Sequence, residues 1–184
     1  MFENENKISS VAYTVSCFGI RPYVLLSFGE TLEDMYIMIH ELGHAVHDIY
    51  MQENQPLATC YSSVFVDEVI STLNELLLTD YLLKSTDNPL ERIELLAGAI
   101  DNMEYYFSSA LRSDLIYQAY TCIEQGKPFT AEFLDSVFVA AYGDYYGGSV
   151  SLPNTSGWAK YGVLNYYDYQ YTTSIAASTR IYLH

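Results

Sequence analysis

The sequence has few basic residues, few cysteines and no long apolar run. Its 184 residues include 8 Lys and Arg against 23 Asp and Glu, so the formal net charge is −15. A chain with this charge repels phosphate backbones, which argues against nucleic-acid binding. Its longest apolar runs are far too short to span a bilayer, so we expect no membrane segment.

The three cysteines, Cys17, Cys60 and Cys122, are far apart and odd in number. This pattern predicts neither a disulfide framework nor a cysteine zinc site, and it fits a reducing compartment. The N-terminus is polar and acidic, without the basic region and apolar core of a signal peptide. We therefore expect a soluble cytoplasmic protein.

Composition and pattern predict a mainly α fold with a small β element near the N-terminus. Half of the residues are hydrophobic and 17% are charged, which suits a globular chain, here a single domain over residues 1–184. Two apolar, β-branched runs, Val11–Phe18 and Tyr23–Phe28, read as strands separated by Gly19–Pro22.

The rest of the chain predicts helices. Thr31 followed by Glu33 and Asp34 is a typical helix start. Helical patterns cover about 32–51, 62–84, 90–125, from Thr130 to near Gly143, and the second half of 158–182.

The first predicted helix carries a His-Glu-x-x-His motif, His40 to His44. Positions i and i+4 lie on one helical face, so both imidazoles can reach one ion. Zinc accepts imidazole nitrogens at about 2.0–2.1 Å, which two histidines one turn apart can supply. Glu41 sits at the edge of the same face, where it can take a proton from a zinc-bound water.

A catalytic zinc needs a third protein ligand and an open fourth position. The next helix offers Asp67, Glu68 and Glu75. Glu68 lies in a largely apolar stretch, where acids are rare unless they are paired. The helix also carries one polar stripe, formed by Glu68, Ser71, Thr72 and Glu75. The alternative interpretation of this stripe is a solvated helix face.

Several segments, taken together and in order, resemble the catalytic region of the oligoendopeptidase F and thimet oligopeptidase family of zinc metallopeptidases. These segments are Pro22–Leu26, Thr31–Asp34, His40–His47, Phe65–Glu75 and Tyr166–Tyr171. The resemblance implies a mostly helical fold with one zinc per chain, held between two helices. It implies that His40, His44 and Glu68 are the ligands and that Glu41 is the general base.

The resemblance also assigns roles to C-terminal tyrosines. It implies that Tyr169 donates to the oxyanion and that its neighbour Tyr166 binds substrate. A phenol suits this role because it can donate a hydrogen bond to developing negative charge. The strand near Tyr13–Phe18 would pair with an extended peptide.

Two departures from the family leave an alternative function open. Family members are much longer, so the resemblance covers only their C-terminal third and omits the other wall of a channel that limits substrates to short peptides. The family histidine that follows the C-terminal tryptophan is also missing after Trp158. The leading hypothesis is a zinc-dependent core that hydrolyses internal bonds of short peptides. The alternative is a non-catalytic or impaired zinc- or peptide-binding remnant or fragment of such a peptidase.

Three further expectations concern features outside the motif. His47 is expected to be exposed, with a place beside the metal ligands as the alternative. Arg112, on a helix poor in basic residues, is expected to be a buried salt-bridge partner with a structural role. Apolar surface that the rest of the family architecture would cover predicts self-association, most simply as a homodimer.

Overall fold

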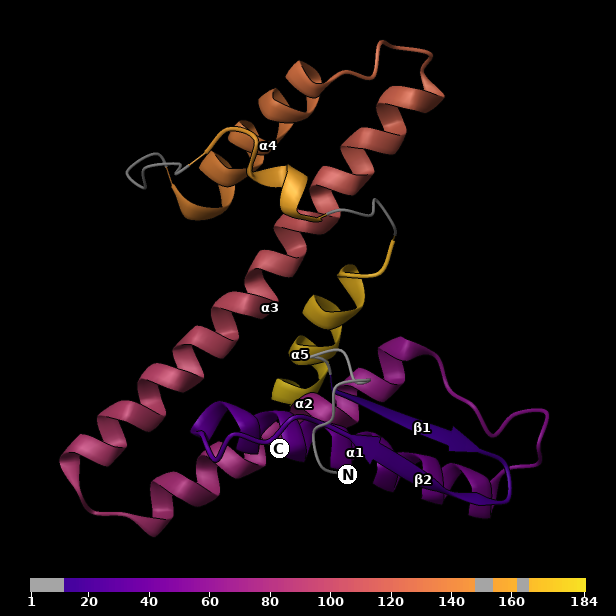
Figure 1. Ribbon diagram of the computed structural model, residues 1–184, viewed down its shortest axis with the longest axis vertical. Coiled ribbons are helices and arrows are strands. Elements are labelled where there is room, and N and C mark those ends of the chain that lie inside the picture. Colours follow the sequence, from indigo (N-terminus) through magenta and orange to yellow (C-terminus); the bar gives the residue numbers. More distant parts are fainter. Residues whose placement is uncertain (1–11, 148–153, 162–165) are drawn as a thin grey trace. The chain divides into compact units, whose positions relative to one another are not determined.

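The structure, a computed structural model, describes residues 12–147, 154–161 and 166–184. The chain is mainly helical with a two-stranded sheet near its N-terminus, which confirms the predicted fold class (Figure 1). The elements are β1 (Tyr13–Cys17), β2 (Ile20–Leu25), α1 (Leu32–Asn54), α2 (Val64–Ser85), α3 (Pro89–Glu124), α4 (Ala131–Tyr146), the 3₁₀ helix η1 (Gly157–Tyr161) and α5 (Tyr169–Tyr182).

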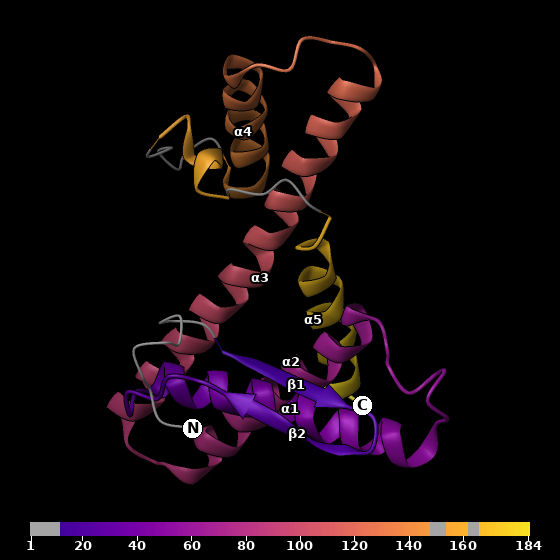
Figure 2. The same cartoon turned by 45° about the vertical axis from the view of Figure 1, so that its right-hand side comes forward.

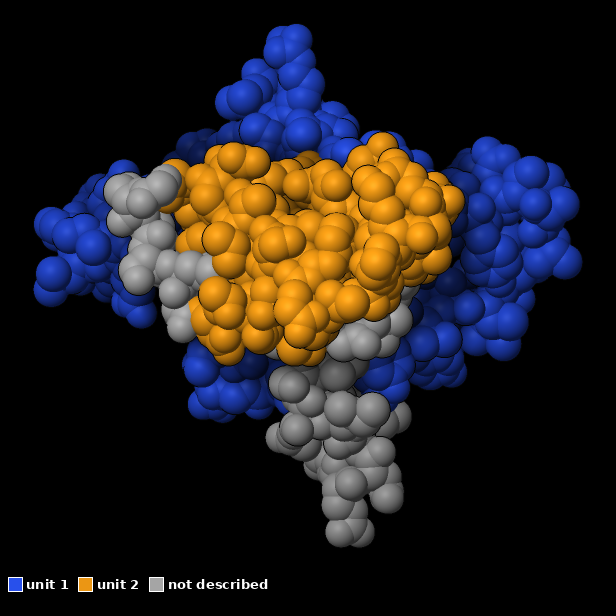
Figure 3. All heavy atoms as spheres, turned by 90° about the horizontal axis from the view of Figure 1, so that it is seen from above, with its two compact units in different colours: residues 1–102, 173–184 blue, residues 103–172 orange. Residues whose placement is uncertain are grey.

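The chain divides into two compact units, coloured separately in Figure 3. The first unit contains residues 1–102 and 173–184, and the second contains residues 103–172. The expectation of a single domain stays a prediction. Among the described helices, none has both the length and the apolar character needed to cross a membrane.

The two strands form an antiparallel hairpin in which Thr14 lies opposite Val24. The separating segment expected to reach Pro22 is shorter, because the turn ends at Gly19 and β2 begins at Ile20. Gly19 has a φ of 79°, which a residue with a side chain rarely adopts. Both strands of a two-stranded sheet are edges, so the missing N–H of Pro22 is tolerated. The hairpin lies along α1 (Figures 1 and 2).

Helix α1 begins after Thr31, the cap that the sequence predicted, and Asp34 completes a reciprocal pair with it. The Asp34 backbone N–H donates to the Thr31 hydroxyl at 3.1 Å, and the Thr31 backbone N–H donates to the Asp34 carboxylate at 3.0 Å. This reciprocal pair satisfies two of the donors that a helix leaves free at its start. The cap fixes where α1 begins.

Helix α5 packs against α2 through small polar residues. The hydroxyls of Thr72 on α2 and Ser178 on α5 are 3.0 Å apart, and Ser174 donates to the Phe65 carbonyl at 2.9 Å. Thr72, Ser174 and Ser178 are fully buried. The C-terminal helix, predicted from the second half of 158–182, therefore supports the helix that carries Glu68.

The second unit has a core between α3 and α4. Its buried members are Leu111, Leu115, Ala119, Leu134, Phe138 and Ala141. Helix α4 runs to Tyr146, beyond the end predicted near Gly143. Tyr142, Tyr145 and Tyr146 pack against this core, and that burial outweighs the low helix propensity of Gly143.

Candidate metal and catalytic site

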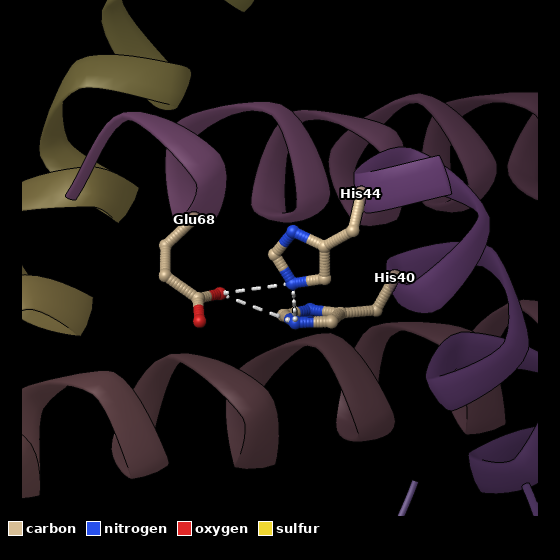
Figure 4. A group of neighbouring side chains, drawn as sticks. All are labelled: His40, His44 and Glu68. Carbon is tan, nitrogen blue, oxygen red and sulfur yellow. Dashed lines mark hydrogen bonds and ion pairs between the residues drawn. The ribbon is translucent and has the colours of Figure 1, made fainter. Parts of the chain in front are cut away.

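Helix α1 places the two motif histidines on the face that meets α2. The Nε2 atoms of His40 and His44 are 3.2 Å apart, and both side chains are largely buried, at 17% and 18% exposure. Figure 4 shows the two rings turned toward the same point. The structure thus confirms that spacing of one helical turn brings both imidazoles together.

Glu68 reaches the same point from α2. One of its carboxylate oxygens, Oε2, lies 3.2 Å from His40 Nε2 and 3.7 Å from His44 Nε2 (Figure 4). The Ser71 hydroxyl donates to this oxygen at 2.9 Å and holds it in place. The polar stripe that contains Glu68 and Ser71 is buried, so the interpretation as a solvated helix face is wrong.

Glu75, which the sequence offered as another possible ligand, lies behind His40. Its Oε1 is 2.5 Å from His40 Nδ1, and its other oxygen accepts a hydrogen bond from the Asn102 side chain. A carboxylate on the second ring nitrogen fixes the orientation of a metal-binding histidine and leaves the first nitrogen free to ligate. The sequence signal for this role is the two-turn spacing between Glu68 and Glu75.

The pKa values of His40, His44 and Glu68 are shifted by burial and by the charges of their neighbours. Burial by itself lowers the pKa of His40, but hydrogen bonds to Glu68 and Glu75 outweigh it and raise the pKa to about 10. Burial, followed by the positive charge of His40, lowers the pKa of His44. Burial works to raise the pKa of Glu68, yet its hydrogen bond with His40 keeps that pKa below the ordinary range. Without a metal, His40 therefore holds a proton at neutral pH.

The three donors fit a zinc ion in both number and spacing. His40, His44 and Glu68 each offer one atom, and these atoms lie within 4.8 Å of one another. Two ligand atoms on a tetrahedral zinc, each about 2.0–2.1 Å from the metal, are about 3.3 Å apart. The three separations, at 3.2, 3.2 and 3.7 Å, are close to that value. Two nitrogens and one carboxylate oxygen also match the donor set of catalytic zinc sites.

Glu41 is held by the hairpin as well as by its own helix. It is 7% exposed, and its Oε2 accepts a hydrogen bond from the Thr14 hydroxyl at 2.7 Å. Its negative charge acts on the His44 imidazole, which places it beside the candidate metal ligands. Its role as general base stays a prediction.

Gly43 lets α1 and α2 approach closely beside the histidines. A Cβ atom added at Gly43 would lie 2.9 Å from the Ser71 Cα and 2.9 Å from the Asn74 side chain. A glycine inside a helix costs stability unless close packing requires it. The sequence showed the glycine within the motif but not its contact.

We expect Gly43→Ala to destabilise the chain by about 1–3 kcal/mol, because the Ser71 backbone cannot yield without moving α2. Denaturant unfolding measures this effect. Gly98→Ala is the matched control, since its added methyl would meet only a Leu32 side-chain carbon at 3.8 Å. The control should be neutral or stabilising, because alanine favours a helix. Equal effects of the two substitutions would contradict this account of Gly43.

The prediction that His47 is exposed is wrong. Its side chain is 14% exposed, and its Nε2 lies 3.0 Å from the Ser62 hydroxyl and 3.3 Å from the Asp67 carboxylate. Ser62 also donates to Asp67. His47, Ser62 and Asp67 thus join α1 to the start of α2, one residue before Glu68. Asp67, which the sequence also offered as a possible metal ligand, is engaged in this contact. Only the three-residue spacing from His44 hinted at it.

The second unit contains the other predicted residues. Arg112 donates to the Asp168 carboxylate at 3.1 Å and is largely buried, which confirms the expected salt bridge. Tyr166 packs its ring on Tyr120, with ring centres 4.9 Å apart. Tyr166 and Tyr169 are about half exposed. Their predicted roles in substrate and oxyanion binding stay predictions.

Comparisons with known proteins agree with this site. The sequence model of peptidase family M3 matches residues 1–182. Oligopeptidase PepF of Bacillus subtilis is 30% identical over 183 residues, which are 97% of this chain and 27% of the relative. The chromosomal oligoendopeptidase F of Lactococcus lactis subsp. cremoris is 32% identical, over 97% of this chain and 30% of the relative.

A solved structure shares the fold. The crystal structure of a Chlamydophila abortus protein assigned as a peptidase superposes with a TM-score of 0.79 and 34% identity, over 96% of this chain and 30% of that one. The chain thus spans less than a third of the length of these relatives. Because the family model covers nearly all of its residues, the chain belongs to peptidase family M3.

Proposed function

We propose that this chain is the zinc-binding core of a metallopeptidase that hydrolyses internal bonds of short peptides. The observation that carries the proposal is the convergence of His40, His44 and Glu68 from two helices. The names of the relatives, oligopeptidase and oligoendopeptidase, support peptide substrates. The net charge of −15 favours neutral or basic peptides over acidic ones.

The ligand set of the proposed site is His40, His44 and Glu68. When bound there, zinc supplies a Lewis acid that polarises the scissile carbonyl and activates a water. Glu75 orients His40 through its Nδ1, and Ser71 orients Glu68. These outer contacts hold the donor atoms at fixed positions before any ion arrives.

Glu41 handles the proton in the proposed reaction. It takes a proton from the attacking water and then passes it to the leaving amine, so one carboxylate serves as base and acid in turn. Tyr169 is proposed to donate to the oxyanion and Tyr166 to contact the peptide. Hairpin residues near Tyr13–Phe18 are proposed to pair with the extended substrate.

Metal analysis combined with a fluorogenic peptide assay, with and without a chelator, tests the proposal. We expect one zinc per chain and hydrolysis that the chelator stops and added zinc restores. Protein purified without chelators that contains no metal and cleaves no peptide would refute it.

A non-catalytic zinc- or peptide-binding function is the second candidate. It is favoured by the missing histidine after Trp158. Bound zinc together with peptide binding, but without cleavage, would support this candidate over the enzyme.

We expect zinc uptake to release about one proton per ion at pH 7.5. The pKa of His40 is about 10 without the metal, whereas ligation needs its neutral ring. Zinc affinity should therefore fall about tenfold for each pH unit below this value, since a proton competes for the site. Titration calorimetry in two buffers of different ionisation enthalpy counts the protons released. Identical heats in both buffers would contradict the assignment of that proton to His40.

A further inference from the structure

The catalytic carboxylate of the proposed enzyme has a single side-chain partner among the described residues. The Thr14 hydroxyl is 2.7 Å from Glu41 Oε2 and 2.8 Å from the Glu41 backbone carbonyl oxygen. Thr14 lies 27 positions earlier in the sequence, on β1, so this contact joins the hairpin to α1. A hydroxyl has one hydrogen to donate, and here both acceptors belong to the same residue.

The geometry of β1 aims Thr14 at α1. Tyr13 and Val15, its neighbours in the strand, are exposed at 42% and 51%, whereas Thr14 is half-buried. Alternate residues of a strand face opposite sides, so Thr14 lies on the side that faces the helix. Its branched Cβ restricts χ1, and pairing with Val24 in β2 fixes its backbone. Glu41 is thus bonded to a rigid donor.

We propose that Thr14 is the positioning residue of Glu41, an inference that rests on the proposed peptidase function. A general base must hold its oxygen within hydrogen-bond reach of the proton that it removes. The bond from Thr14 fixes Oε2. In the described part of the chain no hydrogen bond engages Oε1, so that oxygen is left to face the reacting water.

The alternative is that Thr14 only fastens the hairpin to α1 through the Glu41 backbone carbonyl. The two roles differ in what they affect. A fastening role changes stability and leaves the chemical step alone. A positioning role changes kcat with little effect on KM, because the base acts in the transition state and not in substrate binding.

The experiment compares Thr14→Val, which keeps the shape but removes the hydroxyl, with Thr14→Ser, which keeps the hydroxyl. In the zinc-loaded full chain we expect Thr14→Val to lower kcat about 10- to 100-fold, as a misplaced catalytic group does, with KM and zinc content unchanged. Thr14→Ser should retain most of the activity. Thr59→Val, the same chemical change at an exposed threonine between α1 and α2, is the control and should match the parent. A Thr14→Val variant with parental kcat would overturn the proposal.

A second measurement tests the contact without any catalysis. In the metal-free chain, Thr14→Val, Glu41→Ala and the double variant form a cycle for denaturant unfolding. If Thr14 holds the Glu41 side chain, the shifts in unfolding midpoint of the two single variants do not sum in the double variant. Additive shifts would mean that Thr14 bonds only the backbone, and they would overturn the inference. If the parent cleaves no peptide, the proposed function fails, while the cycle still decides the contact.

Discussion

Glu41→Gln is expected to lower peptide hydrolysis by about 10²–10⁴-fold while the chain keeps its zinc. The amide matches the carboxylate in shape but cannot take a proton from water. The proposed metal ligands, His40, His44 and Glu68, are untouched by this change. Steady-state kinetics on a fluorogenic peptide and metal analysis of the same sample measure both parts of the expectation.

Glu53→Gln is the matched control, because Glu53 is an exposed acid on the same helix. It should leave both hydrolysis and metal content at the parental level. If Glu41→Gln were as active as the parent, the hydrolysis would come from another source. The zinc- or peptide-binding function would then be the better account of the chain.

The helices could be predicted because local signals mark them. Thr31 and Asp34 form the cap that starts α1, and Pro89 and Gly126 bracket α3 as expected from their backbone preferences. The structure departs from the predicted ends of elements where packing outweighs local propensity. Gly143 does not end α4 because the tyrosines that follow it pack on the core, and Pro22 joins β2 because a two-stranded sheet has only edge strands.

The cluster of His40, His44 and Glu68 could be predicted in part for the same reason. His40 and His44 lie one helical turn apart, so one helix brings them together whatever surrounds it. Contacts around this cluster come from other elements: Thr14 on β1 bonds Glu41, and Asn102 on α3 bonds Glu75, the partner of His40. Such contacts depend on how the elements pack together, and the spacing of residues along a single sequence does not reveal that packing. His47 is largely buried, against expectation, because Ser62 just before α2 and Asp67 in the first turn of α2 pair with its ring.

Replacement of Glu68 is expected to abolish stable zinc binding. Loss of a residue behind a metal ligand typically costs about 10–100-fold in affinity, so loss of a ligand itself should exceed the upper end of that range. Glu68→Ala also removes the partner that His40 Nε2 has at 3.2 Å, which further disorganises the two imidazoles. Zinc affinity measured by competition with a chelator, and zinc content after dialysis, check this expectation.

The Asp67→Asn variant tests whether Glu68 binds zinc as a ligand or only attracts it through its negative charge. Asp67 is the adjacent acid on α2, yet its carboxylate bonds Ser62 and His47 and lies outside the His40, His44 and Glu68 group. The substitution Asp67→Asn removes one negative charge one residue away from Glu68. A purely electrostatic attraction for zinc would therefore weaken in this variant as well. We expect Asp67→Asn to keep one zinc per chain and Glu68→Ala to lose it. Equal retention in both variants would show that Glu68 is not a ligand, and the proposed ligand set would be wrong.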